Sequence, residues 1–504
     1  MSRVVIVALL ILAQFVIIAL SMFVFFEYFA LYYTLASLLS IVVVCRIVSK
    51  RDNPSYKMAW IILVLILPPF GVAVYIIFKG NKLSPKKIRQ MEGMNHAPLT
   101  SAPEYTKHIS DNFTDLSAKK QSDYITNSAS CPPYQNTDIT YFASGEEFFP
   151  VMLEELKKAE KYIFLEYFII DRGEMWDKIH EILLDKAARG VDVRIIYDDM
   201  GCINHLDTGF NRFLESEGIR CHVFNRFIPV LSARLNNRNH RKICAVDGKI
   251  AFTGGVNIAD EYINKIERYG YWKDNALMLE GDAAWSMTVM FLAMWDTLDK
   301  EDSEKEDYSK YLPDTLGKTK KNSLGIVQPY TDNPMDNRPV GETIYLNMLY
   351  SAKKYVWITT PYLIIDYTME QALCTAAQSG VDVRIITPGT PDKRIVYEAT
   401  KSTYKGLIEA GVKIYEYSPG FIHAKTFICD DKYATVGSVN LDFRSLYLHF
   451  ECGVWMYDSP AIFDVKSDYE ETLTQCHEIS EEDCKVGVVR SAVRSVLALM
   501  APLI

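Results

Sequence analysis

The sequence lacks the cysteine patterns that mark a metal site or a disulfide framework. Its 10 cysteines form no CxxC pair and show no cysteine–histidine spacing of the zinc-binding kind. Several lie inside apolar runs, such as Cys244 in KICAV and Cys429 in TFICD, where buried free thiols are expected. We therefore predict no metal site, and the free thiols favour the cytoplasm for the bulk of the chain.

An excess of positive charge is also missing. The chain carries 54 Lys and Arg residues against 63 Asp and Glu residues, which gives a formal net charge of -9. Proteins that bind nucleic acid are normally basic, so we predict no nucleic-acid partner. A locally basic active site is still compatible with this balance.

Charged residues are scarce in the first eighty positions, which hold three long apolar runs at 4–26, 28–45 and 58–78. A helix needs about 20 apolar residues to cross the hydrocarbon core of a bilayer. We therefore predict three transmembrane helices within 1–80 and a multi-pass protein of the cell membrane. No small-residue cleavage site follows the first run, so a cleaved signal peptide is not expected.

The third apolar run leaves the topology open. Basic residues flank it on both sides, and the positive-inside rule favours the cytoplasm for both flanks. Pro68 and Pro69 lie within the run and predict a break in the helix. A re-entrant hairpin and a kinked full crossing are both compatible with this pattern.

The remainder of the chain has an α/β pattern and repeats itself. Strand-like and helix-like segments alternate from about residue 138. The string GVDVRII occurs at 190–196 and again at 380–386, and further matches keep the same order in both copies. The predicted units are a linker at 81–135, one half at 136–300, a charged connector at 301–322 and a second half at 323–480.

The repeat is most detailed around two HxKxxxxD motifs. The strings NHRKICAVDGKIAFTGGVNIADEY (239–262) and IHAKTFICDDKYATVGSVNLDFRS (422–445) align without a gap. Each contains one motif, followed by a pair of small residues and an asparagine. The motif residues are His240, Lys242 and Asp247 in the first copy and His423, Lys425 and Asp430 in the second. The residues that follow are Gly255 and Asn257 in the first copy and Ser438 and Asn440 in the second.

These residue types suit phosphoryl transfer without a metal or cofactor. Side chains on a strand repeat with period two, so the His and Lys of H-x-K point to the same face. Two ammonium groups and two Asn amides can neutralise the oxygens of a phosphodiester, and the small pair lets the backbone approach it. One imidazole can attack phosphorus to give a covalent phosphohistidine. The other can protonate the leaving alkoxide and then deprotonate the incoming alcohol.

The motifs resemble those of the phospholipase D superfamily, over roughly residues 138–480. Within it, the chain resembles the bacterial cardiolipin synthases. The resemblance is carried by the N-terminal apolar runs and by RLNNRNHRKICAVDGKIAFTGGVNIADEY (234–262), GYWKDNALMLEG (270–281) and GSVNLDFRSLYLHFE (437–451). It implies an α/β fold in which two homologous halves with mixed sheets surround one pseudo-twofold active site. The first apolar run is additional to the two usual in the family.

The resemblance also implies an activity and residue roles. The implied reaction is phosphatidyl transfer between two molecules of phosphatidylglycerol, which gives cardiolipin and glycerol. His240 is the implied nucleophile and His423 the acid and base, although the pseudo-symmetry leaves this order open. Glu451 and Asp274 are the implied carboxylates that orient the imidazoles. An acceptor at the far ring nitrogen would fix the tautomer and stabilise the imidazolium.

Several alternatives stay open at this point. Asp247 and Asp430 are expected at strand ends, in a structural role. A phospholipase D-type hydrolase or a phosphatidylserine synthase would use the same intermediate with water or serine as acceptor, and the motifs do not separate these activities. A nuclease is disfavoured by the apolar N-terminus and the acidic net charge, and an inactive scaffold is disfavoured by the two intact motifs. Phosphatidylglycerol and membrane lipid are the expected partners, and a homo-oligomer is left open.

The C-terminal segment at 481–504 predicts an amphipathic helix. One face carries Val486, Val489, Val493, Val496, Leu497 and Met500, and the opposite face carries Arg490, Ser491, Arg494 and Ser495. Such a helix fits an interfacial contact with a membrane, and packing on the protein is the alternative.

Overall fold

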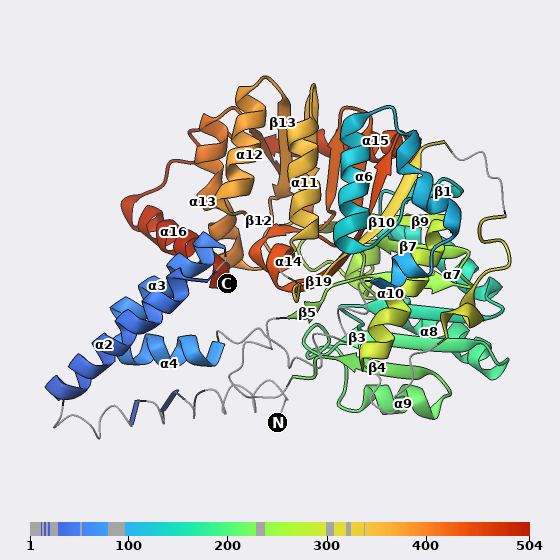
Figure 1. Ribbon diagram of the computed structural model, residues 1–504, viewed down its shortest axis with the longest axis horizontal. Helices are drawn as coiled ribbons and strands as arrows, with labels where there is room; N and C mark the ends of the chain where they lie inside the picture. Colours follow the sequence, from blue (N-terminus) through green and yellow to red (C-terminus); the bar gives the residue numbers. More distant parts are fainter. Residues whose placement is uncertain are drawn as a thin grey trace.

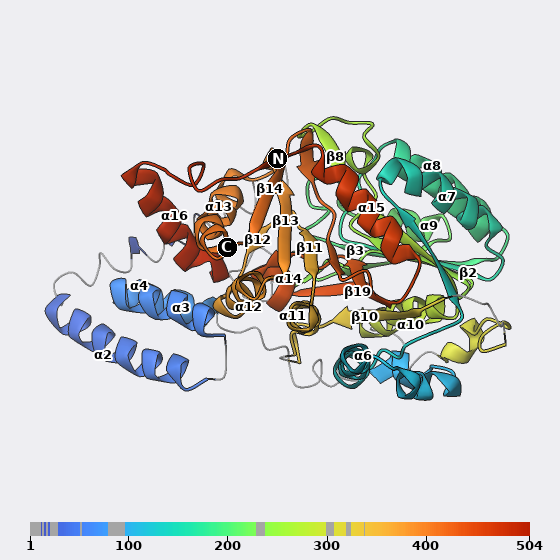
Figure 2. The same ribbon diagram turned by 90° about the horizontal axis from the view of Figure 1, so that it is seen from above.

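Two mixed β-sheets, each flanked by helices, form the body of the molecule (Figures 1 and 2). The structure is a computed structural model, and it describes residues 12, 15–16, 19–20, 29–50, 53–78, 96–227, 237–298, 307–318, 324–336 and 338–503. The predicted α/β class and the division into two similar halves are confirmed by this architecture.

The first half is built on a seven-stranded sheet in the order β1-β9-β7-β6-β2-β3-β4. β2, β3 and β4 are parallel, and the other neighbours are antiparallel. β2 is buried along its whole length, as expected for a parallel strand covered by helices. The strands are β1 (Thr137–Phe142), β2 (Tyr162–Tyr167), β3 (Asp192–Asp198), β4 (Arg220–Phe224), β6 (Ile243–Val246), β7 (Ile250–Gly254) and β9 (Ala276–Gly281). The helices are α7 (Gly145–Lys158), α8 (Glu174–Ala188), α9 (Phe210–Ser216), η5 (Asp260–Ile263) and α10 (Ala283–Leu298).

The second half repeats this arrangement in the order β10-β19-β17-β16-β11-β13-β14, with β20 at the edge beyond β14. The GVDVRII strings contribute β3 in one half and β13 in the other, at equivalent places. The strands are β10 (Ile326–Asp332), β11 (Tyr355–Thr359), β13 (Asp382–Pro388), β14 (Lys413–Tyr417), β16 (Thr426–Cys429), β17 (Tyr433–Gly437), β19 (His449–Tyr457) and β20 (Cys476–Glu478). The helices are α11 (Val340–Ser351), α12 (Tyr367–Gln378), α13 (Arg394–Glu409), α14 (Phe443–Tyr447) and α15 (Ala461–Leu473).

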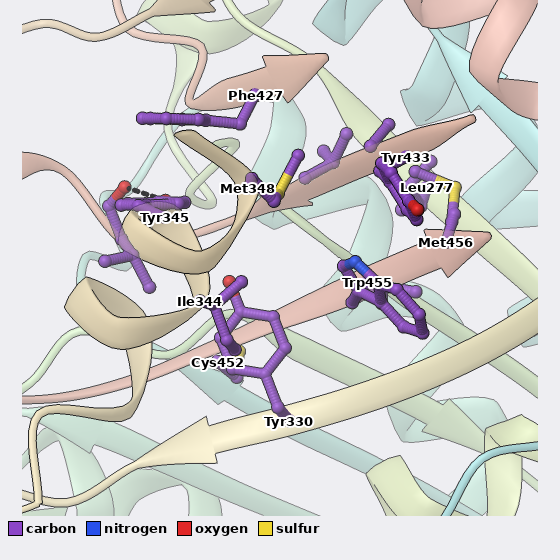
Figure 3. Close-up of a cluster of buried hydrophobic side chains, with 14 of the residues drawn as sticks. Leu277, Tyr330, Ile344, Tyr345, Met348, Phe427, Tyr433, Cys452, Trp455 and Met456 are labelled. Carbon is purple, nitrogen blue, oxygen red and sulfur yellow. Dashed lines mark hydrogen bonds between the residues drawn. The ribbon is translucent and has the colours of Figure 1, made fainter. Parts of the chain in front are cut away.

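One apolar core is shared between the two halves (Figure 3). Tyr345 of α11 stacks on Phe427 of β16, with ring centroids 4.0 Å apart. Leu277 of β9, from the first half, belongs to the same buried cluster as Trp455 and Met456 of β19. The halves are therefore joined by side-chain packing as well as by the chain. Short strands add to the contact between them, because β5 (Arg238–Asn239) pairs with β19 and β8 (Tyr271–Lys273) pairs with β15 (Gly420–Ile422). A further short pair, β12 (Leu363–Ile364) with β18 (Leu441–Asp442), lies within the second half.

The N-terminal helices α2 (Phe29–Val48), α3 (Pro54–Ile66) and α4 (Pro68–Phe78) form a small apolar cluster of their own. The break predicted at the Pro-Pro pair separates α3 from α4. A Cβ at Gly71 would lie 2.3 Å from the Leu63 carbonyl oxygen, so glycine permits the close approach of the two helices. α3 and α4 thus turn back on one another as a helical hairpin (Figure 1).

None of the described helices combines the length and the apolar character required to cross a bilayer. The first predicted span, at 4–26, lies almost wholly outside the described residues. The second and third predicted spans, at 28–45 and 58–78, correspond to α2 and to the hairpin of α3 with α4.

The segments predicted as linker and connector hold more structure than expected. The described part of 81–135 includes η2 (Glu104–His108), η3 (Ser110–Asn112) and α6 (Leu116–Ala129). α6 packs on α11 and β10. It was not predicted from the sequence, because its polar composition gives no apolar repeat of helical period. In the connector, η6 (Tyr308–Tyr311) buries Tyr311 against the first half. The chain ends in α16 (Val488–Met500) and η7 (Ala501–Leu503).

Candidate active site

The two motif histidines lie at the seam between the halves. His240 follows β5, which pairs in parallel with the start of β19 from the second half. Its amide donates to the Phe450 carbonyl at 2.9 Å. His423 follows β15, which pairs with β8 of the first half, and its amide donates to the Lys273 carbonyl at 2.7 Å. Each histidine is therefore held on a strand of the opposite half.

A carboxylate from the opposite half contacts each imidazole. Nδ1 of His240 lies 3.0 Å from both carboxylate oxygens of Glu451. Nδ1 of His423 lies 2.7 Å from Oδ2 of Asp274. A carboxylate at Nδ1 favours the tautomer with the proton on that nitrogen and leaves the lone pair on Nε2. The structure thus brings both predicted carboxylates to the imidazoles and pairs them crosswise.

The small residues that follow each motif lie beside these carboxylates. Ser438 donates its hydroxyl to Glu451, and Ser445 donates to the other oxygen of Glu451 at 2.5 Å. At the equivalent place in the first half, a Cβ on Gly255 would lie 1.9 Å from Oδ1 of Asp274. The structure therefore places Gly255 and Ser438 against the carboxylates that support the histidines. Direct contact of either residue with a phosphate stays a prediction.

The two motif lysines are buried next to their histidines. Nζ of Lys242 donates to the His240 carbonyl at 2.7 Å, and Nζ of Lys425 donates to the His423 carbonyl. An ammonium has three donors, so each lysine keeps donors for an anionic ligand. Burial disfavours the charged form and lowers the pKa of Lys242 to about 8 and the pKa of Lys425 to about 7.

Burial also keeps both imidazoles neutral at pH 7. It lowers the pKa of His240 to about 3, against the opposing charge of Glu451. It lowers the pKa of His423 to about 4, with further lowering by the charge of Lys425. The charge of Lys242 also contributes to the lowered pKa of His423, which belongs to the other motif. The two motifs therefore act on one another electrostatically, as expected of a single site.

The two asparagines are engaged with protein groups. Asn257 accepts from the Ile169 amide at 3.1 Å and donates to the Tyr262 hydroxyl at 2.7 Å. Asn440 donates to Asp442 at 3.2 Å, and its buried Oδ1 has no hydrogen-bond partner. Asn257 thus ties the segment after β2 to the site, whereas the bond of Asn440 joins two side chains of its own segment. Contact of either amide with a phosphate stays a prediction.

The two motif aspartates hold the strands together at their ends. Asp247 follows β6 and accepts from the amides of residues 160–162, each at 2.8 Å. Asp430 follows β16 and accepts from the amides of residues 353–355 at 2.7, 2.8 and 2.9 Å. Both have positive φ, which aspartate tolerates better than most residues. These contacts tie each motif strand to the start of β2 or β11 and support a structural role.

Aromatic rings and a third histidine surround the imidazoles. The ring of Phe168 lies 5.1 Å from His240, and the ring of His449 lies 5.6 Å from it. Tyr262 and Trp272 each lie 5.5 Å from the ring of His423. None of these side chains, nor Ser445, was predicted from the sequence to belong to the site. The available signal was position, because Trp272 and His449 each precede an orienting carboxylate by two residues.

One group in the described part of the chain has donor atoms close enough to hold a metal ion. It consists of His240, His449 and Glu451, whose ligand atoms lie within 4.8 Å of one another. Glu451 already accepts hydrogen bonds from an imidazole and two serine hydroxyls. Ordinary hydrogen bonding therefore accounts for His240 and Glu451, whereas both ring nitrogens of His449 are buried without a hydrogen-bond partner, with Nδ1 3.7 Å from Glu451.

Comparison with known proteins places this site in a family. A profile described as "Cardiolipin synthase, PLD-like domain" matches residues 152–286 and 345–475, which contain one motif each. The chain belongs to the cardiolipin synthase family of phospholipase D-like proteins. A second family profile, the phospholipase D-nuclease N-terminal domain, matches residues 38–80, which include most of α2 and all of α3 and α4.

Relatives of the family match the chain along most of its length. A cardiolipin synthase of Listeria innocua is 33% identical over 442 residues, which cover 86% of this chain and 90% of the relative. An uncharacterized protein of Streptococcus mutans is 42% identical over 459 residues, which cover 90% and 98%. The crystal structure of a phosphatidylserine synthase of Haemophilus influenzae has a TM-score of 0.58 at 16% identity and covers 76% of this chain and 98% of that one. This last similarity concerns the fold alone.

Proposed function

We propose that the chain is a cardiolipin synthase that transfers a phosphatidyl group from one phosphatidylglycerol to another. The observation that carries this proposal is the pair of crosswise imidazole–carboxylate contacts, each with a buried lysine, in a member of this family. The choice of a second phosphatidylglycerol as acceptor is supported by the named relatives at 33% identity.

In the first step, Nε2 of neutral His240 attacks phosphorus, and a P–N bond forms as the P–O bond to glycerol breaks. Protonated His423 gives its proton to the leaving glycerol oxygen. The negative phosphodiester favours this protonation, because its charge opposes the effect of burial, which lowers the pKa of His423. Lys242 and Lys425 neutralise the non-bridging oxygens as the transition state forms.

In the second step, neutral His423 takes the proton from a glycerol hydroxyl of the second phosphatidylglycerol. The oxygen attacks phosphorus, the P–N bond breaks and its electron pair returns to His240. Cardiolipin and one glycerol are the products, and both histidines regain their starting protonation states. Glu451 and Asp274 hold the Nδ1 protons and stabilise whichever imidazole carries positive charge.

We propose further that the enzyme is held at the cell membrane by its N-terminal helices. The proposal is supported by the exposed apolar side chains of α2, α3 and α4 and by the family match that covers this region. The catalytic halves would then lie on the cytoplasmic side, in keeping with the seven unpaired cysteines that they contain.

The test uses purified full-length protein in detergent and phosphatidylglycerol with separate labels in the acyl chains and in the head group. Cardiolipin and free glycerol in equal amounts are expected. Phosphatidic acid without cardiolipin would contradict the proposal and favour a hydrolase. Formation of phosphatidylserine in preference to cardiolipin when serine is added would favour the second acceptor class. The double variant H240A/H423A is the control for contaminating activity.

A further inference from the structure

In the amphipathic C-terminal helix α16, Arg494 and Leu497 pack against the protein, whereas Ser491 and Ser495 are exposed. Arg490 and Arg494 both donate to Glu398 of α13, with Nε distances of 3.1 and 2.8 Å. Arg494 is buried in this contact. Hydrogen bonding from Arg490, and to a lesser extent from Arg494, lowers the pKa of Glu398 to about 2. Glu398 is therefore charged at all physiological pH values.

The opposite side of α16 is apolar and open. Val489 and Val493 are 79% and 48% exposed, and Val496 is 58% exposed. A surface helix of a water-soluble protein normally has the reverse arrangement, with its apolar stripe toward the core. Because Glu398 holds the arginines inward, the valine face of α16 (Val489, Val493 and Val496) is fixed outward by the fold.

α16 lies beside the apolar N-terminal helices. α16 and η7 both pack against α3, and Figures 1 and 2 show α16 beside α2–α4 at one end of the molecule. Many exposed side chains of α2–α4 are apolar as well, among them Leu38, Val42, Met58, Leu65, Ile66 and Ile76. Asn53, which caps α3, donates to Asp366 at 2.8 Å and to the Tyr447 hydroxyl at 3.1 Å, so this end is tied to the second half.

We propose that α16 lies in the surface of the lipid bilayer, with the valine face inserted among the acyl chains. This inference rests on the proposed function and adds a second membrane contact to the N-terminal helices. Two contacts, both fixed to the second half, would set the orientation of the catalytic seam relative to the membrane that supplies its substrate.

The contact is made mainly by apolar burial. Glu398 pairs with both arginines of α16 and offsets one of their two positive charges, and the neighbouring Lys485 pairs with Glu482 at 2.8 Å. Attraction to anionic lipid depends strongly on salt, whereas apolar burial does not. We therefore expect most of the contribution of α16 to remain at high salt and in vesicles of different net charge.

The first test compares the variant V489S/V493S/V496S with the matched control F213S/F463S, which changes exposed phenylalanines on α9 and α15. Cardiolipin formation is measured with phosphatidylglycerol in vesicles and in detergent micelles. We expect turnover in vesicles to fall about tenfold for the valine variant, because three apolar side chains lose their insertion, and turnover in micelles to stay at the wild-type level. Unchanged turnover in vesicles would overturn the proposal, as would an equal loss in vesicles and micelles.

The second test reads the contact without activity. V493W and F463W are reconstituted into phosphatidylcholine vesicles with and without brominated acyl chains. Fluorescence from V493W above the native background should be quenched by the brominated lipid at every salt concentration, and that from F463W should not. Absence of quenching at V493W would overturn the proposal, and emission that depends on protein density would assign the valine face to a second copy of the chain. If the wild-type enzyme made no cardiolipin but V493W was quenched, the proposed function would fail and the lipid contact would stand.

Discussion

The two histidines of the active site have the same kind of support, but the two halves build that support differently. Glu451 accepts hydrogen bonds from Ser438 and Ser445, whereas Asp274 lies against Gly255, where no side chain would fit. The longer side chain, Glu451, therefore lies beside the hydroxyl of Ser438, and the shorter one, Asp274, lies beside Gly255. Both halves have the imidazole–carboxylate contact, but the residues around the carboxylate differ together. Glu451 occurs with Ser438, and Asp274 occurs with Gly255.

The surroundings of the motifs differ further. Arg241 and Glu166 form a buried ion pair in the first half, with Nε and Nη2 of the arginine 2.9 and 2.6 Å from the carboxylate. The aligned positions in the second half are Ala424 and Thr359, which carry no charge. The conserved part of the repeat is thus limited to the reacting groups and their immediate support, which leaves the two histidines free to take different roles.

The largest effect is expected from the histidines themselves. H240A and H423A should each lower cardiolipin formation by about 10³-fold or more, because a nucleophile or an acid–base group is lost. A phosphatidyl ester with an acidic leaving group needs no protonation, so H423A should still release that group once per enzyme, whereas H240A should release none. Rapid-quench measurement of this burst checks the assignment. A burst from H240A and none from H423A would reverse the two roles.

The buried ion pair of the first half gives the next largest expected effect. R241A should lower the free energy of unfolding by about 3–5 kcal/mol, because it leaves the Glu166 carboxylate buried without its main partner. The matched variant R241M/E166Q removes both charges and should recover most of this loss. The measurement is the unfolding transition in detergent. Equal free energies of unfolding for R241A and the wild-type protein would mean that the ion pair does not stabilise the first half.

Exchange of the small residues should affect the two halves unequally. G255S places a Cβ against Asp274 and should displace that carboxylate from His423, with an expected fall in kcat of about 10²-fold. S438G removes one hydroxyl donor from Glu451 and should lower kcat about tenfold. Steady-state kinetics, with the thermal midpoint as a control for folding, measure both. A smaller fall in kcat for G255S than for S438G would contradict the pairing of Asp274 with Gly255 and of Glu451 with Ser438.

The sequence predicted the reacting groups better than their pairing. Two aligned copies of HxKxxxxD were enough to predict two halves and one site. The expectation that H-x-K lies within a strand was wrong, because residues 240–242 link β5 to β6 and residues 423–425 link β15 to β16. The crosswise contact of Glu451 with His240 could not be predicted, because it depends on how β5 pairs with β19. α6 was missed because its buried positions include Gln121 and Ser122, which give no apolar period.

The last and smallest expected effect separates the two lysines by pH. Burial lowers the pKa of Lys425 to about 7 and that of Lys242 to about 8, so Lys425 loses its charge first as the pH rises. A phosphodiester anion binds the charged forms better, so KM for phosphatidylglycerol should rise a few-fold from about pH 7 upward. An arginine remains charged throughout this range. K425R should therefore remove the rise that begins near pH 7, and K242R should leave it in place. If both variants keep the wild-type profile, the rise comes from another group, and the two lysines do not differ in the way their burial implies.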